Sequence, residues 1–444
     1  MTQHLSVMII GSGAREHTIS YAYEKSPQVD RVIVAPCSNF VSYKRKKEVV
    51  SSKNGSLKDP PSILSLAKKY KPDLIDVAQD DALASGVVDL LQESGFQVFG
   101  PTKQAARIEW DKRWSREFMQ RHQIPHPHFR YFDSEANGIS YVTELYCEDP
   151  TRLLYTKATG LCFGKGALKS TNLEGAIRNI HKMKSFPNEA GKVFLVEEGL
   201  VGEEFSCSAL SDGKNYKLLK SAQDNKTVYN FDEGDQTGGM GAISPAKVTD
   251  SIYHEIEENQ ISRVINGMAS EGVPYQGILY LGGIIVNETP INIEYNARWG
   301  DPECQVVLPS VETDYVDIVT ACLEGRLREV EVRQDDKIRV CVVGASRGYP
   351  HHYSQVTGKR IYGLEEAMEM DGITIFGAGI DVKDGKCYAN GGRLLSVVAE
   401  GKNILEAKQR AYSAIAHISV EGNNLHYRTD IGWRDVERFL KNLE

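Results

Sequence analysis

The chain has 444 residues, of which 41% are hydrophobic and 25% charged, as in soluble globular proteins with several compact units. A formal net charge of −8 argues against a non-specific nucleic-acid binder and favours small-molecule partners. The eight cysteines show no C-x-x-C pair and no zinc pattern, which is typical of thiols in a reducing cytosol. The apolar stretch 5–10 is too short for a signal-peptide core or a membrane span, so we expect a cytoplasmic protein without a membrane partner.

The first hundred residues alternate strand-like apolar runs with helical patterns, which predicts a parallel sheet wrapped by helices. Four strands are expected, at 5–10, 31–35, 73–78 and 97–100. The first strand runs directly into Gly-Ser-Gly-Ala-Arg-Glu-His at positions 11–17. Glycines let the backbone turn tightly there, and the helix that follows offers free N–H groups to an anion. We therefore expect a phosphate beside Gly11 and Gly13.

Two other interpretations of this glycine loop compete with the phosphate site. A dinucleotide-binding fingerprint would require a third glycine and an acidic residue where the chain has Glu16 and Pro36, which disfavours a dehydrogenase. A glycine turn that serves only close packing between helix and strand stays open.

The remaining sequence predicts a multidomain protein of the α/β and α+β classes. A helical stretch spans 103–122, and strands are expected at 152–158, 192–198, 204–210 and 277–286. The last unit has expected strands at 339–345, 372–380 and 392–400, and an expected helix at 404–418. We expect domains of residues 1–103, 104–334 and 335–444.

The segment 293–298, Ile-Glu-Tyr-Asn-Ala-Arg, has the pattern of a metal site on a strand. Side chains alternate along a strand, so Glu294 and Asn296 should share one face while Ile293 and Tyr295 pack on the other. A carboxylate and an amide oxygen side by side are hard donors suited to Mg²⁺. Arg298 is the next residue on that face and could hold a phosphoryl or acyl-phosphate group. The alternative is a surface ion pair between Glu294 and Arg298.

Lysines beside glycines are further candidates for binding ATP phosphates. Lys157 ends a predicted strand just before the loop 160–166, in which two glycines flank Lys165. A lysine on a strand gives a fixed positive charge, and a glycine loop can close over phosphates. Lys112, in the helical stretch, could supply another cation. Each lysine alone is typical of a solvated surface charge, and only their joint pattern favours nucleotide binding.

Two acidic pairs could hold the rest of a nucleotide. Val-Glu-Glu at 196–198 ends an apolar strand, and Gly-Glu-Glu follows at 202–204. Such a hinge would suit a nucleobase held by backbone groups and a ribose held by a carboxylate, with Glu197 and Glu204 as candidates. The alternative is an acidic loop that leaves a strand.

Taken together, these motifs resemble those of the phosphoribosylamine–glycine ligase family, also called glycinamide ribonucleotide synthetases, of the ATP-grasp superfamily. The resemblance spans nearly the whole chain. The similar blocks are GSGxREH at 11–17, FGPTKQAA at 99–106, KxxGLxxGKG at 157–166, QDxK at 223–226, TGGMGA at 237–242, ExNxRxGDPExQ at 294–305, NGGRLLSV at 390–397 and DIGWR at 430–434.

The resemblance implies a fold and an activity. The fold would comprise a parallel-sheet pre-ATP-grasp domain, a two-lobed ATP-grasp domain with a mobile lobe at about 125–198, and a small mixed α/β C-terminal domain. ATP, with Mg²⁺ or Mn²⁺, would phosphorylate glycine, and the glycyl phosphate would react with 5-phosphoribosylamine. The product would be glycinamide ribonucleotide of de novo purine biosynthesis. We expect a monomer or a weak homodimer and no nucleic-acid partner.

The resemblance also implies roles for particular residues. Glu294 and Asn296 would bind the metal ion, and Arg298 and Asp224 would be catalytic. The nucleotide would contact Lys112, Lys157, Lys165, Glu197 and Glu204. The substrates would lie beside Gly11, Gly13, Asp80, Thr237, Gly238 and Gly239.

The chain departs from the family pattern in two segments. The usual VGPE turn reads Val-Ala-Gln-Asp at 77–80, and the usual QDHKR and GPNTGGMG read QDNKT at 223–227 and GDQTGGMG at 234–241. Loss of a His and an Arg with gain of Asp235 makes this region more acidic, which disfavours an anionic phosphate. A divergent ATP-grasp ligase with another amine or acid, and a nucleotide-binding protein without turnover, therefore stay open.

Overall fold

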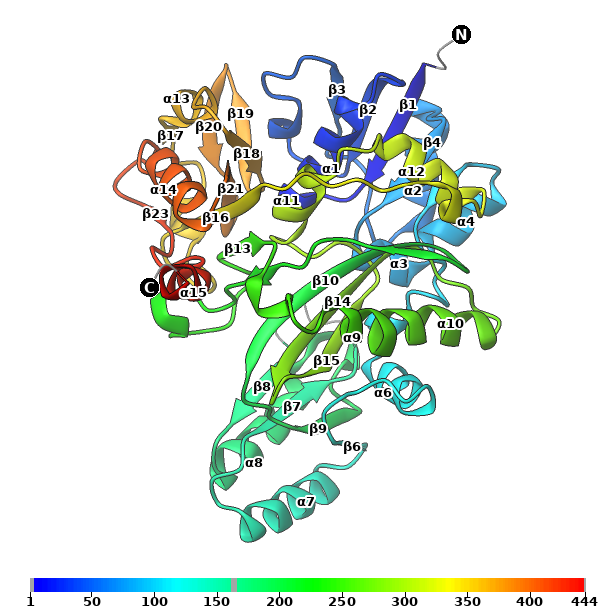
Figure 1. Cartoon of the computed structure of the whole chain (residues 1–444), viewed down its shortest axis with the longest axis vertical. Coiled ribbons are helices and arrows are strands. Elements are labelled where there is room, and N and C mark those ends of the chain that lie inside the picture. The colour runs from blue at the N-terminus through cyan, green and yellow to red at the C-terminus, as the bar shows by residue number, and fades with distance from the viewer. Residues whose placement is uncertain (1–3, 161–165, 443–444) are drawn as a thin grey trace.

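A computed structural model describes residues 4–160 and 166–442, and its N-terminal unit is a five-stranded parallel sheet (Figure 1). The strand order is β3-β2-β1-β4-β5, formed by β1 (Leu5–Ile10), β2 (Val29–Ala35), β3 (Glu48–Ser51), β4 (Leu74–Val77) and β5 (Val98–Phe99). The accompanying helices are α1 (Ala14–Lys25), α2 (Pro60–Tyr70), α3 (Asp80–Ser85) and α4 (Val87–Glu93). The four predicted strands are confirmed. The sequence pattern does not predict β3, because only Val49 and Val50 mark it as apolar.

A four-stranded antiparallel sheet forms the lobe at the bottom of Figure 1. Its order is β6-β9-β7-β8, formed by β6 (Phe129–Phe132), β7 (Leu154–Ala158), β8 (Ala167–Ser170) and β9 (Phe194–Glu198). Helices α7 (Glu135–Glu148) and α8 (Leu173–Lys182) pack against it around a core that includes Val142, Ile180 and Phe194. The predicted strands 152–158 and 192–198 are confirmed as β7 and β9.

A second antiparallel sheet lies at the centre of the molecule. Its order is β11-β10-β14-β15, formed by β10 (Glu203–Asp212), β11 (Tyr216–Leu218), β14 (Gln276–Val286) and β15 (Thr289–Asn296). Between β11 and β14 the chain first forms two strands of another sheet and then a helical segment that comprises α9 (Tyr253–Ile256), a π-helical turn at 257–262 and α10 (Arg263–Ser270). Strand β15 is at the edge of this sheet.

The predicted single helix over 103–122 is wrong. The structure has two helices, α5 (Arg107–Trp110) and α6 (Lys112–Arg121), separated at Asp111. Asp111 has φ −122° and ψ 88°, and its Oδ1 accepts a hydrogen bond from the Trp114 N–H at 3.0 Å. A short acidic side chain that caps a helix N-terminus competes with continuous helix, which the apolar periodicity does not reveal.

The C-terminal unit is built on a sheet of order β12-β13-β16-β21-β18, to which β23 (Leu425–His426) adds beside β16. Its strands are β12 (Gln223–Asp224), β13 (Gly241–Ser244), β16 (Ile338–Ser346), β18 (Ile373–Gly377) and β21 (Arg393–Gly401). Two small two-stranded sheets pair β17 (Ile361–Tyr362) with β22 (Ser419–Val420) and β19 (Ile380–Lys383) with β20 (Lys386–Ala389). The helices are α13 (Leu364–Met368), α14 (Ile404–Ile415) and α15 (Trp433–Lys441).

Two details of this unit differ from the sequence pattern. The predicted strand 372–380 ends at Gly377, and β19 begins only at Ile380, because the chain turns where Gly379 packs against Gly391. An ideal Cβ on Gly379 would lie 2.7 Å from the Gly391 Cα. Strands β12 and β13 come from the sequence before residue 245, yet β13 pairs with β16 of the C-terminal unit. The sheet therefore draws the segment 223–244 into contact with the C-terminal unit.

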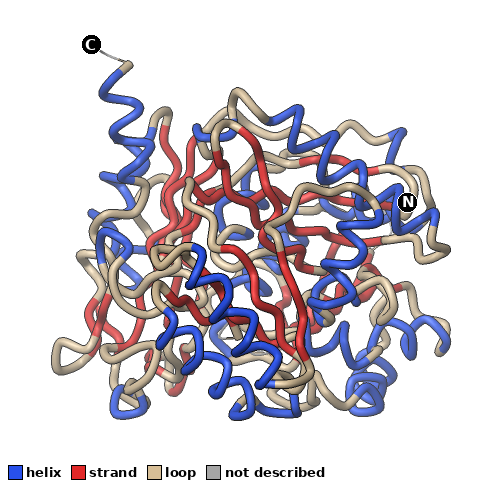
Figure 2. The backbone as a smooth tube through the Cα atoms, turned by 90° about the horizontal axis from the view of Figure 1, so that it is seen from below, coloured by secondary structure: helices blue, strands red, loops and turns tan. Residues whose placement is uncertain are grey.

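One hydrophobic core joins the N-terminal sheet to later parts of the chain. It combines Ile9 and Ile19 with Val306 and Val319 from α11 (Cys304–Val307) and α12 (Tyr315–Leu323), and with Val343 of β16. Figure 2 shows helices lying around the strands of this assembly. Among the described residues, no helix is long and apolar enough to cross a membrane.

The cap at Asp111 generates a stability prediction. Asp111→Ala should lower the free energy of unfolding by about 1 kcal/mol, because the Trp114 N–H loses its acceptor. Asp111→Asn should lose less, since it keeps an acceptor oxygen and removes only the partly exposed ion pair with Arg107, in which Nη2 and Oδ2 lie 2.8 Å apart. Urea unfolding of both variants measures the difference. Equal losses would show that the ion pair, rather than the cap, stabilises this junction.

Candidate active site

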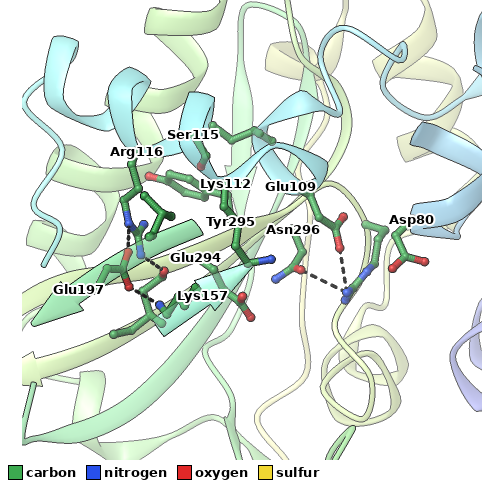
Figure 3. A pocket seen from close by; sticks show the side chains of 14 residues that line it. Asp80, Glu109, Lys112, Ser115, Arg116, Lys157, Glu197, Glu294, Tyr295 and Asn296 are labelled. Atoms are coloured by element: carbon green, nitrogen blue, oxygen red, sulfur yellow. Dashed lines mark hydrogen bonds and ion pairs between the residues drawn. The ribbon is translucent and has the colours of Figure 1, made fainter. Parts of the chain in front are cut away.

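A pocket lies between the lobe, helix α6 and the edge strand β15 (Figure 3). Its lining residues are Asp80, Ile108, Glu109, Lys112, Ser115, Arg116, Lys157, Leu195, Glu197, Ile293, Glu294, Tyr295, Asn296 and Arg298. Helix α3 of the N-terminal unit supplies Asp80, and strands β7 and β9 of the lobe supply Lys157 and Glu197. The fold therefore gathers seven predicted site residues from four separate parts of the chain, namely Asp80, Lys112, Lys157, Glu197, Glu294, Asn296 and Arg298.

A buried carboxylate holds two cations at one end of the pocket. Glu197, 1% exposed, pairs through Oε1 with Arg116 Nε and through Oε2 with Lys157 Nζ. Burial alone would raise the pKa of Glu197, but Arg116 and Lys157 outweigh it and lower that pKa to about 2. Arg116 Nη2 also donates to the Ile293 carbonyl at 2.5 Å, which ties α6 to β15. Both oxygens of Glu197 are engaged, so this side chain fixes the lysine and the arginine in place.

Strand β15 presents the predicted metal-binding pair. Burial would raise the pKa of Glu294, but Lys112, Lys226 and other nearby cations outweigh it and lower that pKa, so Glu294 is ionised at neutral pH. The Asn296 Oδ1 accepts a hydrogen bond from Arg298 Nη2 at 3.1 Å, which orients the carboxamide. A fixed amide oxygen beside an ionised carboxylate fits a hard cation such as Mg²⁺ or Mn²⁺. All four residues of 293–296 form part of the pocket wall, so Ile293 and Tyr295 are not separated from it as the alternation predicts. The Tyr295 hydroxyl is nevertheless buried and donates to the Gln260 carbonyl.

Arg298 is anchored at the other end of the pocket. Its Nη2 lies 2.9 Å from Glu109 Oε1, and the other oxygen of Glu109 accepts from the Ala297 N–H at 2.7 Å. The Nε of Arg298 is buried and has no hydrogen-bond partner within the described ranges. Asp80 reaches this end from helix α3 and interacts electrostatically with Arg298. Figure 3 shows Asp80, Glu109 and Asn296 on this side and Lys157, Glu197 and Arg116 opposite. An anchored arginine thus lies at each end of the pocket, Arg116 at one and Arg298 at the other.

The loop at Gly11 and Gly13 is filled by a side chain of the protein. Both glycines have positive φ, 149° and 115°, and an ideal Cβ on Gly11 would lie 2.8 Å from Glu16 Oε1. Glu16 is fully buried and pairs with Arg15 at 2.8 Å, and burial raises the pKa of Glu16 to about 7. The glycines therefore admit the Glu16 carboxyl group against the N-terminus of α1. The alternative interpretation of the loop requires close packing of this kind.

A second charged cluster combines residues of β10, β12 and β14 with Lys226, which follows β12, and Glu303, which precedes α11. Lys226 Nζ lies 2.8 Å from Asp224 Oδ1 and 3.0 Å from Glu204 Oε2. The neighbouring Glu303 accepts from the Tyr280 hydroxyl at 2.7 Å, and burial together with Asp224 raises its pKa to about 7. Lys226 also lowers the pKa of Glu294, so this cluster adjoins the metal-binding pair electrostatically. Of the predicted residues, Asp224 and Glu204 belong here and do not line the pocket.

The Thr237–Gly239 loop uses its N–H groups within the protein. The Thr237 N–H donates to the Lys226 carbonyl at 2.7 Å, and the Gly238 N–H donates to the Tyr349 hydroxyl at 3.2 Å. The Gly239 N–H donates to Thr237 Oγ1 at 3.0 Å. Neighbouring acceptors in the protein therefore already engage the three backbone N–H groups of this loop.

The residues that differ from the family pattern lie in different parts of the structure. Asn225 is buried and exchanges backbone hydrogen bonds with Met240 and Gly241. Thr227 accepts a hydrogen bond from Arg428 Nη1 at 2.8 Å. Asp235 is exposed and pairs with His351, with Nε2 and Oδ2 3.1 Å apart. Asp235 therefore faces a histidine of the C-terminal unit, and of these altered residues only Asp80 lines the pocket.

The structure adds residues that the sequence did not single out, and it leaves one candidate aside. Arg116 and Glu109 line the pocket, and Lys226 and Glu303 form the second cluster. A signal for Arg116 was present, because it lies four residues after Lys112 and so shares its face of the helix. The pairing of Glu303 with Tyr280 joins distant segments and leaves no local pattern. Lys165 lies outside the described residues.

The structure combines a parallel-sheet domain, an antiparallel lobe and a central antiparallel sheet around a pocket of paired cations and carboxylates. These features define an ATP-grasp protein. Three family models, described as phosphoribosylglycinamide synthetase N domain, ATP-grasp (A) domain and C domain, match residues 5–109, 110–304 and 339–434. The chain belongs to the phosphoribosylglycinamide synthetase family.

Individual relatives agree with this assignment. The phosphoribosylamine–glycine ligase of Vibrio parahaemolyticus is 38% identical over 439 residues, which cover 98% of this chain and 99% of the relative. The trifunctional purine biosynthetic protein adenosine-3 of Bos taurus is 37% identical over 435 residues, but this chain spans only 42% of its length. The crystal structure of phosphoribosylamine–glycine ligase from Thermotoga maritima matches with a TM-score of 0.80 at 29% identity, covering 96% of this chain and 100% of that one.

The Glu197 ion pairs generate a prediction on acid stability. The folded-state pKa of Glu197, about 2, lies below its ordinary value of 4.5, so its stabilisation is complete above pH 4.5 and is lost as the pH falls toward 2. Glu197→Gln should cost about 3–5 kcal/mol at neutral pH, because two buried cations lose their anion, and should flatten the pH dependence in that window. Urea unfolding at several pH values measures both effects.

The matched control is Glu271→Gln. Glu271 accepts two hydrogen bonds at 3.0 Å from Arg121, which also lies in α6, and its Oε1 is 2.8 Å from His122 Nε2. All three side chains are partly exposed, so loss of the Glu271 charge should cost about 1 kcal/mol or less. An equal cost for the two variants would contradict the structural role assigned to Glu197.

Proposed function

We propose that this chain ligates glycine to 5-phosphoribosylamine at the expense of ATP, giving glycinamide ribonucleotide, ADP and phosphate in de novo purine biosynthesis. The convergence of Glu294, Asn296 and Arg298 with Lys112 and Lys157 in one pocket is the observation that carries this proposal. Family membership supports the choice of substrates. The same considerations support a cytoplasmic enzyme that acts on small molecules.

The proposed reaction begins with phosphoryl transfer. A carboxylate resists attack by an amine because its charge repels nucleophiles and oxide is a poor leaving group. Transfer of the γ-phosphoryl group to a glycine carboxylate oxygen gives glycyl phosphate and ADP and removes both obstacles. Arg298, held by Glu109 and Asn296, directs its guanidinium into the pocket and would stabilise the charge on the transferring group. Its fixed position means that little reorganisation is required during the reaction.

The nucleotide would lie along the cationic wall of the pocket. Lys157 and Lys112 would contact phosphate oxygens, and Glu197 would keep Lys157 oriented. Glu294 and Asn296 would hold Mg²⁺ or Mn²⁺, which supplies charge neutralisation for the phosphates when bound. We further propose that the lobe at about 125–198 closes over ATP. Lys165, which follows Lys157 by eight positions in the sequence, would act at the same phosphates.

The amine substrate would react on the side of the second cluster. Its nitrogen attacks the carbonyl carbon of glycyl phosphate, the bond from that carbon to the phosphate oxygen breaks, and the nitrogen loses a proton. Asp224, next to Lys226, and Glu303, with a pKa of about 7, are carboxyl groups able to take part in that proton transfer. Asp80, Gly11, Gly13 and the Thr237–Gly239 loop would border the sugar phosphate.

The altered segments support one second candidate, a ligase of the same type with another amine. Asp80 lines the pocket itself, where a longer family Glu would reach farther. Asn225 and Thr227, in contrast, have structural contacts within the protein. The alteration that could change the amine is therefore the one at Asp80.

The proposed activity predicts that ADP release requires glycine and phosphoribosylamine together. Purified protein should form ADP and glycinamide ribonucleotide in equal amounts when given Mg-ATP, glycine and freshly generated phosphoribosylamine. Omission of either substrate should reduce ADP release to background. ADP formation that depends on a different amine or acid would replace this proposal with the divergent ligase, and Mg-ATP binding without any turnover would exclude both.

The metal-binding pair generates a further prediction. Glu294→Gln should lower kcat by about 100-fold or more and weaken the Mg²⁺ dependence of ATP binding, because the ionised ligand is lost. Activity assays and calorimetric ATP titrations at several Mg²⁺ concentrations measure the two effects. The control Glu288→Gln changes an exposed glutamate of the same β14–β15 hairpin and should leave both unchanged. A Glu294→Gln variant with unaltered Mg²⁺ dependence would remove Glu294 from the metal site.

A further inference from the structure

An arginine of the C-terminal unit joins two loops that precede it by many residues in sequence. Arg393, the first residue of β21, donates from Nη1 to the Gly238 carbonyl at 2.6 Å, to the Gly239 carbonyl at 3.4 Å and to the Asp301 carbonyl at 3.0 Å. Its Nη2 donates to Asp301 Oδ2 at 2.7 Å. Only the planar fork of an arginine can satisfy these acceptors together.

Gly238 packs closely against Arg393, and Gly239 packs closely against the second loop. An ideal Cβ on Gly238 would lie 3.1 Å from the Arg393 Cζ, and one on Gly239 would lie 2.4 Å from the Pro302 Cδ. The Tyr349 hydroxyl accepts from the Gly238 N–H, so two side chains of the C-terminal unit fix the backbone of Gly238 from both sides. The Asp301 Oδ1 is held in turn by Gln305 Nε2 at 2.7 Å.

These loops carry the groups on the amine side of the proposed reaction. Thr237 Oγ1 donates to the Lys226 carbonyl at 2.7 Å, and Lys226 pairs with Asp224. Glu303 follows Asp301 by two residues. The residues that line the ATP pocket come instead from α3, α5, α6, β7, β9 and the segment 293–298, none of which Arg393 contacts through a hydrogen bond in the described structure. Arg393 is thus linked to one half of the active site.

We propose that Arg393 is a positioning residue that holds the amine-side loops in register, so that the amine reaches the acyl phosphate before water does. This inference rests on the proposed function. If the loops are loosened, ATP still phosphorylates the substrate carboxylate. Water oxygen then attacks the carbonyl carbon, the bond to the phosphate oxygen breaks, and the acid and phosphate are released without amide. ADP formation becomes uncoupled from ligation.

Arg393→Lys and Arg393→Gln test this inference. Both variants should keep the ATP affinity within about two-fold while kcat/KM for amide formation falls about 10- to 100-fold. The ratio of ADP to amide product should rise from one to two or more, and Arg393→Lys should be the milder variant because it keeps the positive charge beside Asp301. Tyr349→Phe should shift the ratio in the same direction by less. Arg410→Lys is the control, since Arg410 bonds the Glu400 carbonyl and Glu406 within the C-terminal unit.

Hydrogen–deuterium exchange gives a second measurement that requires no substrate. Exchange at the Thr237–Met240 amides should accelerate about ten-fold or more in Arg393→Gln, while protection of β7 and β9 by Mg-ATP should stay unchanged. Unchanged exchange at the loop would overturn the inference whatever the activity.

The outcomes separate the inference from the proposed function. A wild-type protein without glycine-dependent ADP release contradicts the proposed function, and the exchange data still decide the role of Arg393 in the loops. An active wild type with tightly coupled Arg393 variants overturns the inference. A raised KM for phosphoribosylamine at a ratio of one would show a direct substrate contact instead of positioning.

Discussion

Four cationic side chains share one pocket, and the carboxylates that balance them are the constraint on which the site depends. Lys157 and Arg116 are held by Glu197, and Arg298 is held by Glu109, while Lys112 lies beside the ionised Glu294. Without these partners the cations would repel one another and could not stay buried. With them, the pocket keeps fixed positive charge where a triphosphate and a transferring phosphoryl group would lie. The anchored arrangement makes electrostatic stabilisation available without reorganisation.

The domains contribute to this site in an unequal way. The lobe supplies Lys157 and Glu197, the central sheet supplies Glu294 and Asn296, and the N-terminal unit supplies Asp80. The C-terminal unit supplies no pocket residue among those described, but its sheet incorporates β13, and Arg393 fixes the loop that precedes β13. This division suits a reaction in two stages. One set of residues would act on ATP and the acid, and a separately supported set would act on the amine.

Short-range patterns were sufficient for part of this site. The pattern at 293–298 predicted that Glu294, Asn296 and Arg298 meet in one pocket, although Ile293 and Tyr295 line it as well. The strand that bears Lys157 followed from its apolar run. Strand positions were predictable because a buried strand needs a continuous apolar run. The break at Asp111 was not predictable in this way, because a capping side chain acts on single N–H groups and leaves no periodic signal.

Interactions between distant segments were beyond the reach of the sequence pattern. The sequence pattern suggests Glu197 as a free carboxylate for a ribose. In the structure, its two oxygens are engaged by Arg116 and Lys157, which lie 81 and 40 positions away in the chain. The resemblance places substrates beside Thr237, Gly238 and Gly239, and only the structure reveals that their N–H groups have acceptors in the protein. Gly11 and Gly13 similarly make room for Glu16. In each case the residue type indicated that the position matters for the site, but only the tertiary structure determined which group that residue contacts.

The central claim is that the acid is activated by phosphorylation of its carboxylate within this pocket. Glycine labelled with ¹⁸O in both carboxylate oxygens tests it most directly, with the released inorganic phosphate analysed by mass spectrometry. Because the bridging oxygen of an acyl phosphate leaves with phosphorus, each phosphate should carry one ¹⁸O atom. Phosphate free of label, formed at the same rate as the amide, would contradict the account.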